Sequence, residues 1–158
     1  MLITNIPVQN RDQALEKVVW YCLRWRIETW HKVLKSGLQV EECRLSTADR
    51  LIRYLAVMSI VAWRILWITL VARVALDTSC CLFLNDFEWK ILLAKFLKNQ
   101  KQIYQPPTLI QSIRWIAQLG GFLARKGDRQ PGIIHLWKGM KKFAAIVEGA
   151  TLAKEIYG

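Results

Sequence analysis

Residues 19–37, VWYCLRWRIETWHKVLKSG, contain the most informative pattern in the chain. This stretch contains no proline, its only glycine is the last residue, and its apolar residues recur at helical spacing, so we expect a helix. Four of its positions follow the spacing Y-x2-R-x3-E-x6-K, namely Tyr21, Arg24, Glu28 and Lys35. At about 100° per residue these four fall inside an arc of roughly 60°. The helix is therefore predicted to carry one polar stripe of mixed charge.

The opposite side of the same helix is apolar. Its residues are Val19, Leu23, Ile27, Trp30 and Leu34. We expect this side to seat the helix on a core and to turn the polar stripe towards a groove. One carboxylate beside two cations and a phenol suits a phosphodiester ligand, because carboxylates bind divalent metals and cations bind phosphate oxygens. The simpler interpretation is a solvated helix face with an i, i+4 ion pair between Arg24 and Glu28.

The run from Tyr21 to Glu28, continued by Lys35-Ser36-Gly37, resembles the Y-R-E-K signature of bacterial insertion-sequence DDE transposases of the cut-and-paste type. A second block is similar to the GGF…PG…LW.G segment near the C-terminus of the same family. It comprises Gly120-Gly121-Phe122, Pro131-Gly132 and Leu136-Trp137-Lys138-Gly139. The two blocks occur in the order that the family has, and the similarity runs from about Asn5 to near the end of the chain.

The resemblance implies a role for each residue of the stripe. Glu28 would be the last of three acidic residues that bind the catalytic divalent metal, Mg²⁺ or Mn²⁺, in the complete enzyme. Tyr21, Arg24 and Lys35 would contact the DNA of the transposon end. Trp25, which lies beside the stripe, either stacks on a displaced base or packs in a core, and packing is the commoner role of a tryptophan.

The other two acidic residues of the family are aspartates on an upstream ribonuclease-H-like sheet. Only 27 residues precede Glu28 here, and their one aspartate, Asp12, matches neither position. We therefore expect the C-terminal part of a transposase, mainly α-helical, with at most a short strand remnant at Leu2-Ile3-Thr4. Residues 1–45 would end the catalytic core, and residues 46–158 would form a helical region for DNA contact and dimerisation.

The charge of the chain favours a nucleic-acid partner. The formal net charge is +11, and the sequence pI is about 9.8. Between Lys90 and Lys142 there are 11 basic residues and one acidic residue, Asp128. Such a surface attracts polyanions in a salt-dependent manner. A basic surface without a specific ligand, or one that meets a membrane surface, is the alternative.

The apolar content is also informative. At 53%, with eight tryptophans, it indicates that some apolar surface belongs against a partner, either the catalytic core or a second copy. The most apolar stretch, Leu51 to Leu84, is interrupted by Arg53, Arg64, Arg73 and Asp77. Because a spanning helix needs about 20 consecutive apolar residues, we expect a long buried helix and no membrane partner. The four cysteines show no C-x2-C pattern and no signal peptide is visible, so we expect no zinc site and a cytoplasmic location.

Capping residues and apolar periodicity predict five helices, the first of which would end with Gly37 as its left-handed C′ residue. They run from Asn10 or Asp12 to Ser36-Gly37, from Ser46 or Thr47 to about Leu76, over about 86–101, from Thr108 to Gly120-Gly121, and over a last helix with the apolar stripe Leu136, Met140, Phe143 and Val147. Asn85 with Glu88 and Thr108 with Gln111 would form capping boxes. The last stripe is either core or an interface between two copies.

The sequence therefore predicts a transposase fragment that contributes transposon-end DNA binding, self-association and the third metal-binding carboxylate. By itself the chain is expected to be inactive, because one carboxylate cannot hold two catalytic metal ions. The alternative from another class is a non-catalytic helical module that binds DNA, or that pairs with intact transposase and interferes with it. In both cases the partners are DNA and either a second copy or intact transposase.

Overall fold

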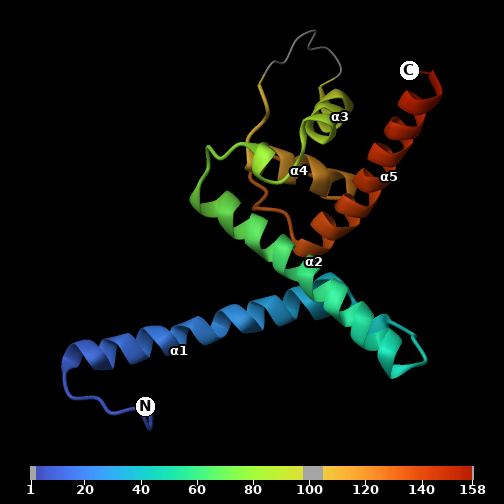
Figure 1. Cartoon of the computed structure of the whole chain (residues 1–158). Helices are drawn as coiled ribbons and strands as arrows, with labels where there is room; N and C mark the ends of the chain where they lie inside the picture. Colours follow the sequence, from blue (N-terminus) through green and yellow to red (C-terminus); the bar gives the residue numbers. More distant parts are fainter. Residues whose placement is uncertain (1–2, 98–104, 158) are drawn as a thin grey trace.

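The computed structural model describes residues 3–97 and 105–157, and most of these residues lie in α-helices (Figure 1). These helices are α1 (Arg11–Lys32), α2 (Ala48–Val74), α3 (Asp86–Phe96), α4 (Leu109–Leu119) and α5 (Ile133–Tyr157). The predicted mainly α-helical fold is confirmed. The predicted strand remnant is not formed within the described residues, because Ile3 and Thr4 lie in irregular backbone. Its first residue, Leu2, lies outside them.

The core lies among α2, α3, α4 and α5. Each helix contributes side chains that are fully buried, among them Ile68 of α2, Leu92 of α3, Ile116 of α4 and Leu136 of α5. Burying one such side chain stabilises the fold by about 1.5–3 kcal/mol. Leu136 belongs to the stripe predicted on the last helix, so at this position the stripe is core.

Two glycines allow α4 and α5 to approach each other at backbone distance. A Cβ added to Gly120 would lie 2.7 Å from the backbone nitrogen of Gly139, and one added to Gly139 would lie 3.2 Å from the backbone nitrogen of Gly120. Gly121, at φ 97°, then takes the chain out of α4 in the left-handed conformation that favours glycine. The helix therefore ends where the sequence predicted.

Both predicted capping boxes are present. The side chain of Asn85 accepts a hydrogen bond from the Glu88 backbone N–H at 2.9 Å, and the Glu88 carboxylate accepts one from the Asn85 N–H at 2.9 Å. Thr108 and Gln111 exchange the same pair of bonds at the start of α4. Each box satisfies two N–H groups that a helix start leaves without partners.

Two helices are shorter than predicted. α2 begins after Thr47, as expected, but ends at Val74, because Ala75 has left the helical region at φ −114° and ψ 82°. α3 ends at Phe96. The remainder of its predicted span, residues 98–101, lies outside the described residues.

The first helix begins as predicted and ends differently. The Asn10 side chain accepts a hydrogen bond from the Gln13 N–H at 2.9 Å and so caps α1. The α-helix stops at Lys32, and Val33–Gly37 continue as a π-helical segment. A short 3₁₀ turn, Val40–Glu42, lies in the link between α1 and α2.

Packing accounts for the π-helical segment. Val33 and Leu34 are buried against the other helices. A Cβ added to Gly37 would lie 2.7 Å from Cγ2 of Ile133, at the start of α5. The predicted role of Gly37, as the left-handed C′ residue that follows the helix, is therefore wrong. Gly37 is the last residue of the π-helical segment, and its small size allows contact with α5.

The rest of α1 projects away from the other helices (Figure 1). None of its residues is buried, and on its apolar side Val19, Leu23 and Ile27 are 58%, 42% and 56% exposed. Only Trp30 near its end and Leu34 beyond it meet the core. The prediction that this side seats the helix is therefore wrong for most of its length within the described residues.

α2 buries one face and exposes the other. The buried residues are Met58, Ala62, Ile65, Ile68 and Ala72. Ile60 and Trp63 on the other face are 67% and 58% exposed, so the predicted buried helix is only half buried. α2 is the one helix of the described residues that is long and apolar enough to cross a membrane, a property that core helices share.

Candidate functional site

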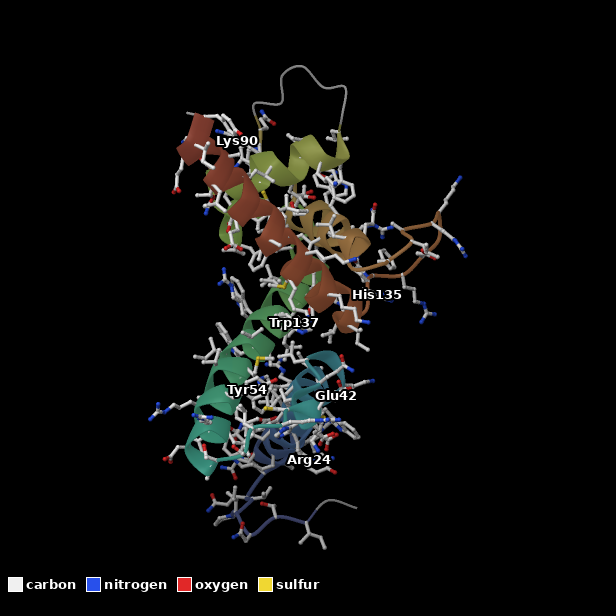
Figure 2. The ribbon with its side chains drawn as sticks, turned by 90° about the vertical axis from the view of Figure 1, so that its right-hand side faces the viewer. Arg24, Glu42, Tyr54, Lys90, His135 and Trp137 are labelled. Carbon is white, nitrogen blue, oxygen red and sulfur yellow. The ribbon has the colours of Figure 1, made fainter. Side chains whose placement is uncertain are left out.

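Three of the four stripe residues lie together on the exposed face of α1. Tyr21, Arg24 and Glu28 all belong to its regular α-helical part. Tyr21 is 45% exposed, and the side chains of Arg24 and Glu28 are 46% and 40% exposed. Figure 2 shows Arg24 on α1, far from Lys90 of α3. This part of the stripe is arranged as the sequence predicted.

Arg24 is the centre of this group. Its Nη1 donates a hydrogen bond to Oε1 of Glu28 and forms an ion pair with it. Its guanidinium carbon lies 5.4 Å from the ring centroid of Tyr21 and 5.0 Å from that of Trp25, at the range of cation–π contacts. Trp25 is 59% exposed, so among the described residues it is not a core residue. A cation, a carboxylate and two aromatic rings thus share one open surface.

Lys35 is placed differently from the prediction. It lies in the π-helical segment, whose i to i+5 hydrogen bonding changes the angle between successive residues. The helical-wheel angle calculated for an α-helix therefore does not apply to Lys35. Its Nζ forms an ion pair with Oε1 of Glu41 at 2.8 Å. The hydrogen bond to Glu41 and the charge of that carboxylate raise the pKa of Lys35.

A cavity of about 460 Å³ lies where α1 meets the other helices. Lys32 lines it from the end of α1, Ser36 from the π-helical segment and Arg73 from the end of α2. Residues 130–135, which include the start of α5, complete the wall. On the helical wheel Lys32 is about 20° from Tyr21, so the cavity continues the polar stripe.

The cavity is suited to an anion. Lys32 and Arg73 form no ion pair with any described residue. The backbone N–H groups in the first turn of α5, at Ile133 and Ile134, have no acceptor in a preceding turn and carry partial positive charge. His135 is fixed beside them, because its Nδ1 donates to the carbonyl oxygen of Gly120 at 3.3 Å. Figure 2 shows His135 at this end of α5.

A closed basic turn adjoins the cavity. The Asp128 carboxylate accepts a hydrogen bond from the Arg125 N–H at 2.7 Å, and Gly127 adopts φ 95°. Three cations, those of Arg125, Lys126 and Arg129, are exposed on this turn. The sequence predicted a basic surface in this half of the chain but not the cavity, because Lys32, Arg73 and the start of α5 are far apart along the chain.

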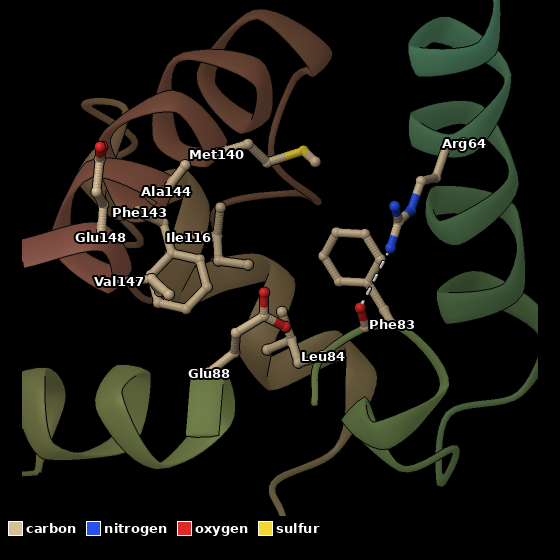
Figure 3. A pocket seen from close by; sticks show the side chains of 10 residues that line it. All are labelled: Arg64, Phe83, Leu84, Glu88, Ile116, Met140, Phe143, Ala144, Val147 and Glu148. Carbon is tan, nitrogen blue, oxygen red and sulfur yellow. Dashed lines mark hydrogen bonds between the residues drawn. The ribbon is translucent and has the colours of Figure 1, made fainter. Parts of the chain in front are cut away.

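A second cavity, of about 360 Å³, lies between α2, α3, α4 and α5 (Figure 3). Its wall is mostly apolar, with the carboxylates of Glu88 and Glu148 beside it. Its one cation, Arg64, donates a hydrogen bond to the carbonyl oxygen of Phe83 at 3.4 Å and lies over the ring of that residue. Two carboxylates make this cavity unsuited to a phosphate.

The residues described contain no group of three or more His, Cys, Asp and Glu side chains that could hold a metal ion. Glu28 is a single carboxylate whose neighbour is Arg24. Divalent cations such as Mg²⁺ take about six oxygen ligands, so this carboxylate suits one position in a site completed by other groups. Asp12, in the first turn of α1, is too far along the helix to join it.

A family model described as the transposase Tn5 dimerisation domain matches residues 60–157, which is more than half of the chain. The match begins within α2 and includes α3, α4 and α5. It also includes the glycine-containing block around Gly120 and Gly139, whereas α1 and its polar stripe precede it.

Proposed function

The chain belongs to the transposase family that carries the Tn5 dimerisation domain, and from this premise we propose that it also supplies DNA binding and one metal-binding carboxylate. Its place in the C-terminal part of a transposase and its role in self-association follow from the family. The DNA would be the transposon end, in an enzyme of the DDE type. The observation that carries this proposal is the position of Arg24 between Glu28, Tyr21 and Trp25 on an exposed helix face.

The continuity of the stripe with the anion cavity supports DNA binding. A phosphate backbone that follows α1 from Arg24 would reach Lys32 and then Arg73. Contacts of this kind position DNA and supply much of its affinity. The exposed ring of Trp25 offers a surface on which an unpaired base can stack.

The surroundings of Glu28 support a role as a metal ligand. A divalent ion bound there would supply Lewis-acid activation of water or of a DNA 3′-hydroxyl in the complete enzyme. Glu28 would contribute carboxylate oxygen, and Arg24, once released from Glu28, could bind a phosphate oxygen of the DNA. The two further carboxylates would come from a ribonuclease-H-like part of the enzyme outside these residues.

The uncovered apolar side of α1 supports the same proposal. Contiguous exposed apolar surface commonly marks an interaction site. Val19, Leu23 and Ile27 lie opposite the polar stripe, so a catalytic part that covered them would leave the stripe open to DNA. We further propose a cytoplasmic location, in which the four free cysteines would stay reduced.

The deciding experiment uses a full-length transposase that contains these residues. Glu28→Gln should leave folding and end binding intact and abolish strand cleavage, because the amide is a poor metal ligand. Glu16→Gln is the matched control, since Glu16 is another exposed glutamate of α1, and its one ion pair among the described residues is with Lys17. It should cleave like the wild type. Full cleavage by the Glu28→Gln enzyme would refute the metal role.

The second candidate function is interference with intact transposase. It is favoured by the extent of the family match, which covers the dimerisation region and not the polar stripe. If it holds, addition of this chain to intact transposase should produce mixed dimers and reduce cleavage in proportion. Mixed dimers with undiminished cleavage would exclude interference.

A further inference from the structure

The ion pair between Lys35 and Glu41 links two anchored segments. Its atoms are 2.8 Å apart, and the two side chains are 58% and 65% exposed. Glu41 lies in the 3₁₀ turn, where its neighbour Val40 is buried, and the preceding Leu38 is buried as well. The backbone on both sides of the pair is therefore held by the core, while the charged ends remain in solvent.

Both cations of the Y-R-E-K pattern, Arg24 and Lys35, form ion pairs within the chain. Three ion pairs occur within the described residues, and two of them neutralise Arg24 and Lys35. The partner of Arg24 is Glu28, which belongs to the motif. The partner of Lys35 is Glu41, which belongs to no motif and for which the sequence suggested no role. A phosphate that approaches Lys35 therefore meets this carboxylate and competes with it for the ammonium group.

We propose that Glu41 is an internal competitor of DNA, which holds Lys35 in the free chain and releases it to a backbone phosphate. The proposal rests on the proposed DNA binding. The exchange is feasible because an exposed lysine–carboxylate pair is weak and the lysine side chain is long and flexible. Glu41 would thereby lower the affinity of the chain for DNA whatever the DNA sequence. It would also determine the salt concentrations at which Lys35 binds a phosphate.

The neighbouring residue provides a matched control. Glu42 lies in the same turn and carries the same charge, but its Oε1 accepts a hydrogen bond from Nε2 of Gln39 at 2.6 Å and it forms no ion pair with a described residue. Glu41→Gln and Glu42→Gln remove the same charge from almost the same place. Any difference between them therefore reports the contact with Lys35 and not the general attraction of a more basic protein.

The experiment measures the affinity of the purified chain for a duplex DNA of about two helical turns at low salt. Glu41→Gln should bind about two- to five-fold more tightly than Glu42→Gln, the range that exposed ion pairs support. In a Lys35→Ala background the difference between the two variants should vanish. Thermal unfolding of each variant verifies that the fold is unchanged.

The outcomes separate the two proposals. Equal affinities of Glu41→Gln and Glu42→Gln, with DNA still bound, would overturn the competitor role and leave the DNA proposal standing. A difference that persists in the Lys35→Ala background would also overturn it. Failure of the wild type and of both variants to bind DNA at low salt would overturn the proposed DNA function and this inference with it.

Discussion

The backbones of Gly120 and Gly139 are in contact, and neither residue has room for a side chain. A Cβ on one would lie 2.7 Å from the nitrogen of the other, and the reverse distance is 3.2 Å. Both residues belong to the block that resembles the transposase C-terminal segment. Gly120 and Gly139 are therefore packing residues of the dimerisation region, and they fix how α5 crosses α4.

Gly139→Ala should destabilise the chain. The methyl group would collide with backbone of α4, which cannot rotate away as a side chain does, and overpacking of this kind costs about 1–3 kcal/mol. Chemical denaturation measures the change. Gly149→Ala is the control in the same helix, because a Cβ there meets no atom within 4 Å. It should be neutral or stabilise by up to about 1 kcal/mol. Equal stability of the two variants would contradict the close contact.

DNA binding by this chain should fall steeply with salt and depend little on sequence. If Arg24, Lys32 and Arg73 each meet a phosphate, the slope of log affinity against log salt should be at least about 3 in magnitude. Titrations of two unrelated duplexes over a range of salt concentrations measure it. An affinity that is unchanged from low to physiological salt would rule out phosphate contacts as the main source of binding.

Arg73→Ala should weaken DNA binding and lower the salt slope by about 1, because it removes one cation from the anion cavity. Arg53→Ala removes the same charge from an exposed position on α2 that does not line the cavity, and it serves as the control. The two variants are compared with one duplex over the same salt series. Identical losses would show that only net charge matters and that the cavity is not a binding site.

The thiols should differ in reactivity. Burial raises the pKa of Cys80 to about 11, whereas Cys22 and Cys81 are exposed. Alkylation near pH 8 should modify Cys22 and Cys81 and spare Cys80 until the chain unfolds, as mass spectrometry of the peptides would show.

The raised pKa of Cys80 also affects stability. Because the pKa is raised in the folded state, the unfolded state releases the proton first. Stability should therefore decline as the pH rises above the ordinary thiol pKa of about 8.5 and towards 11. Rapid labelling of native Cys80 at pH 8 would contradict this burial.

Helix bounds were predictable where the signal is local. Asn10, Asn85 and Thr108 form caps with residues three positions further along the chain. Both partners of each hydrogen bond therefore lie within four consecutive residues of the sequence. The π-helical segment had no such signal. Its residues pack against parts of the chain that are far away in the sequence, such as Ile133 beside Gly37, and helical periodicity alone placed Lys35 at the wrong angle around the helix.

The site was predictable in its chemistry and less so in its surroundings. Tyr21, Arg24 and Glu28 share a face because the α-helical repeat dictates it. The apolar side of α1 was expected to be covered, yet periodicity shows only that a face is apolar and not where its partner lies. In the sequence Arg73 only interrupts an apolar stretch, because its place in the cavity depends on how α2 packs against α4 and the π-helical segment.

α1 meets the core near its end, next to the buried segment Val33–Gly37, so any tilt of the helix would turn about that segment. At about 1.5 Å per residue, the far end of the helix lies about 33 Å from the segment and Glu28 only about 8 Å from it. A tilt of about 5° would then move the far end by about 3 Å but Glu28 by less than about 1 Å. The carboxylate therefore lies where a tilt of the helix would change its position least, and Tyr21, further from the segment, would move more.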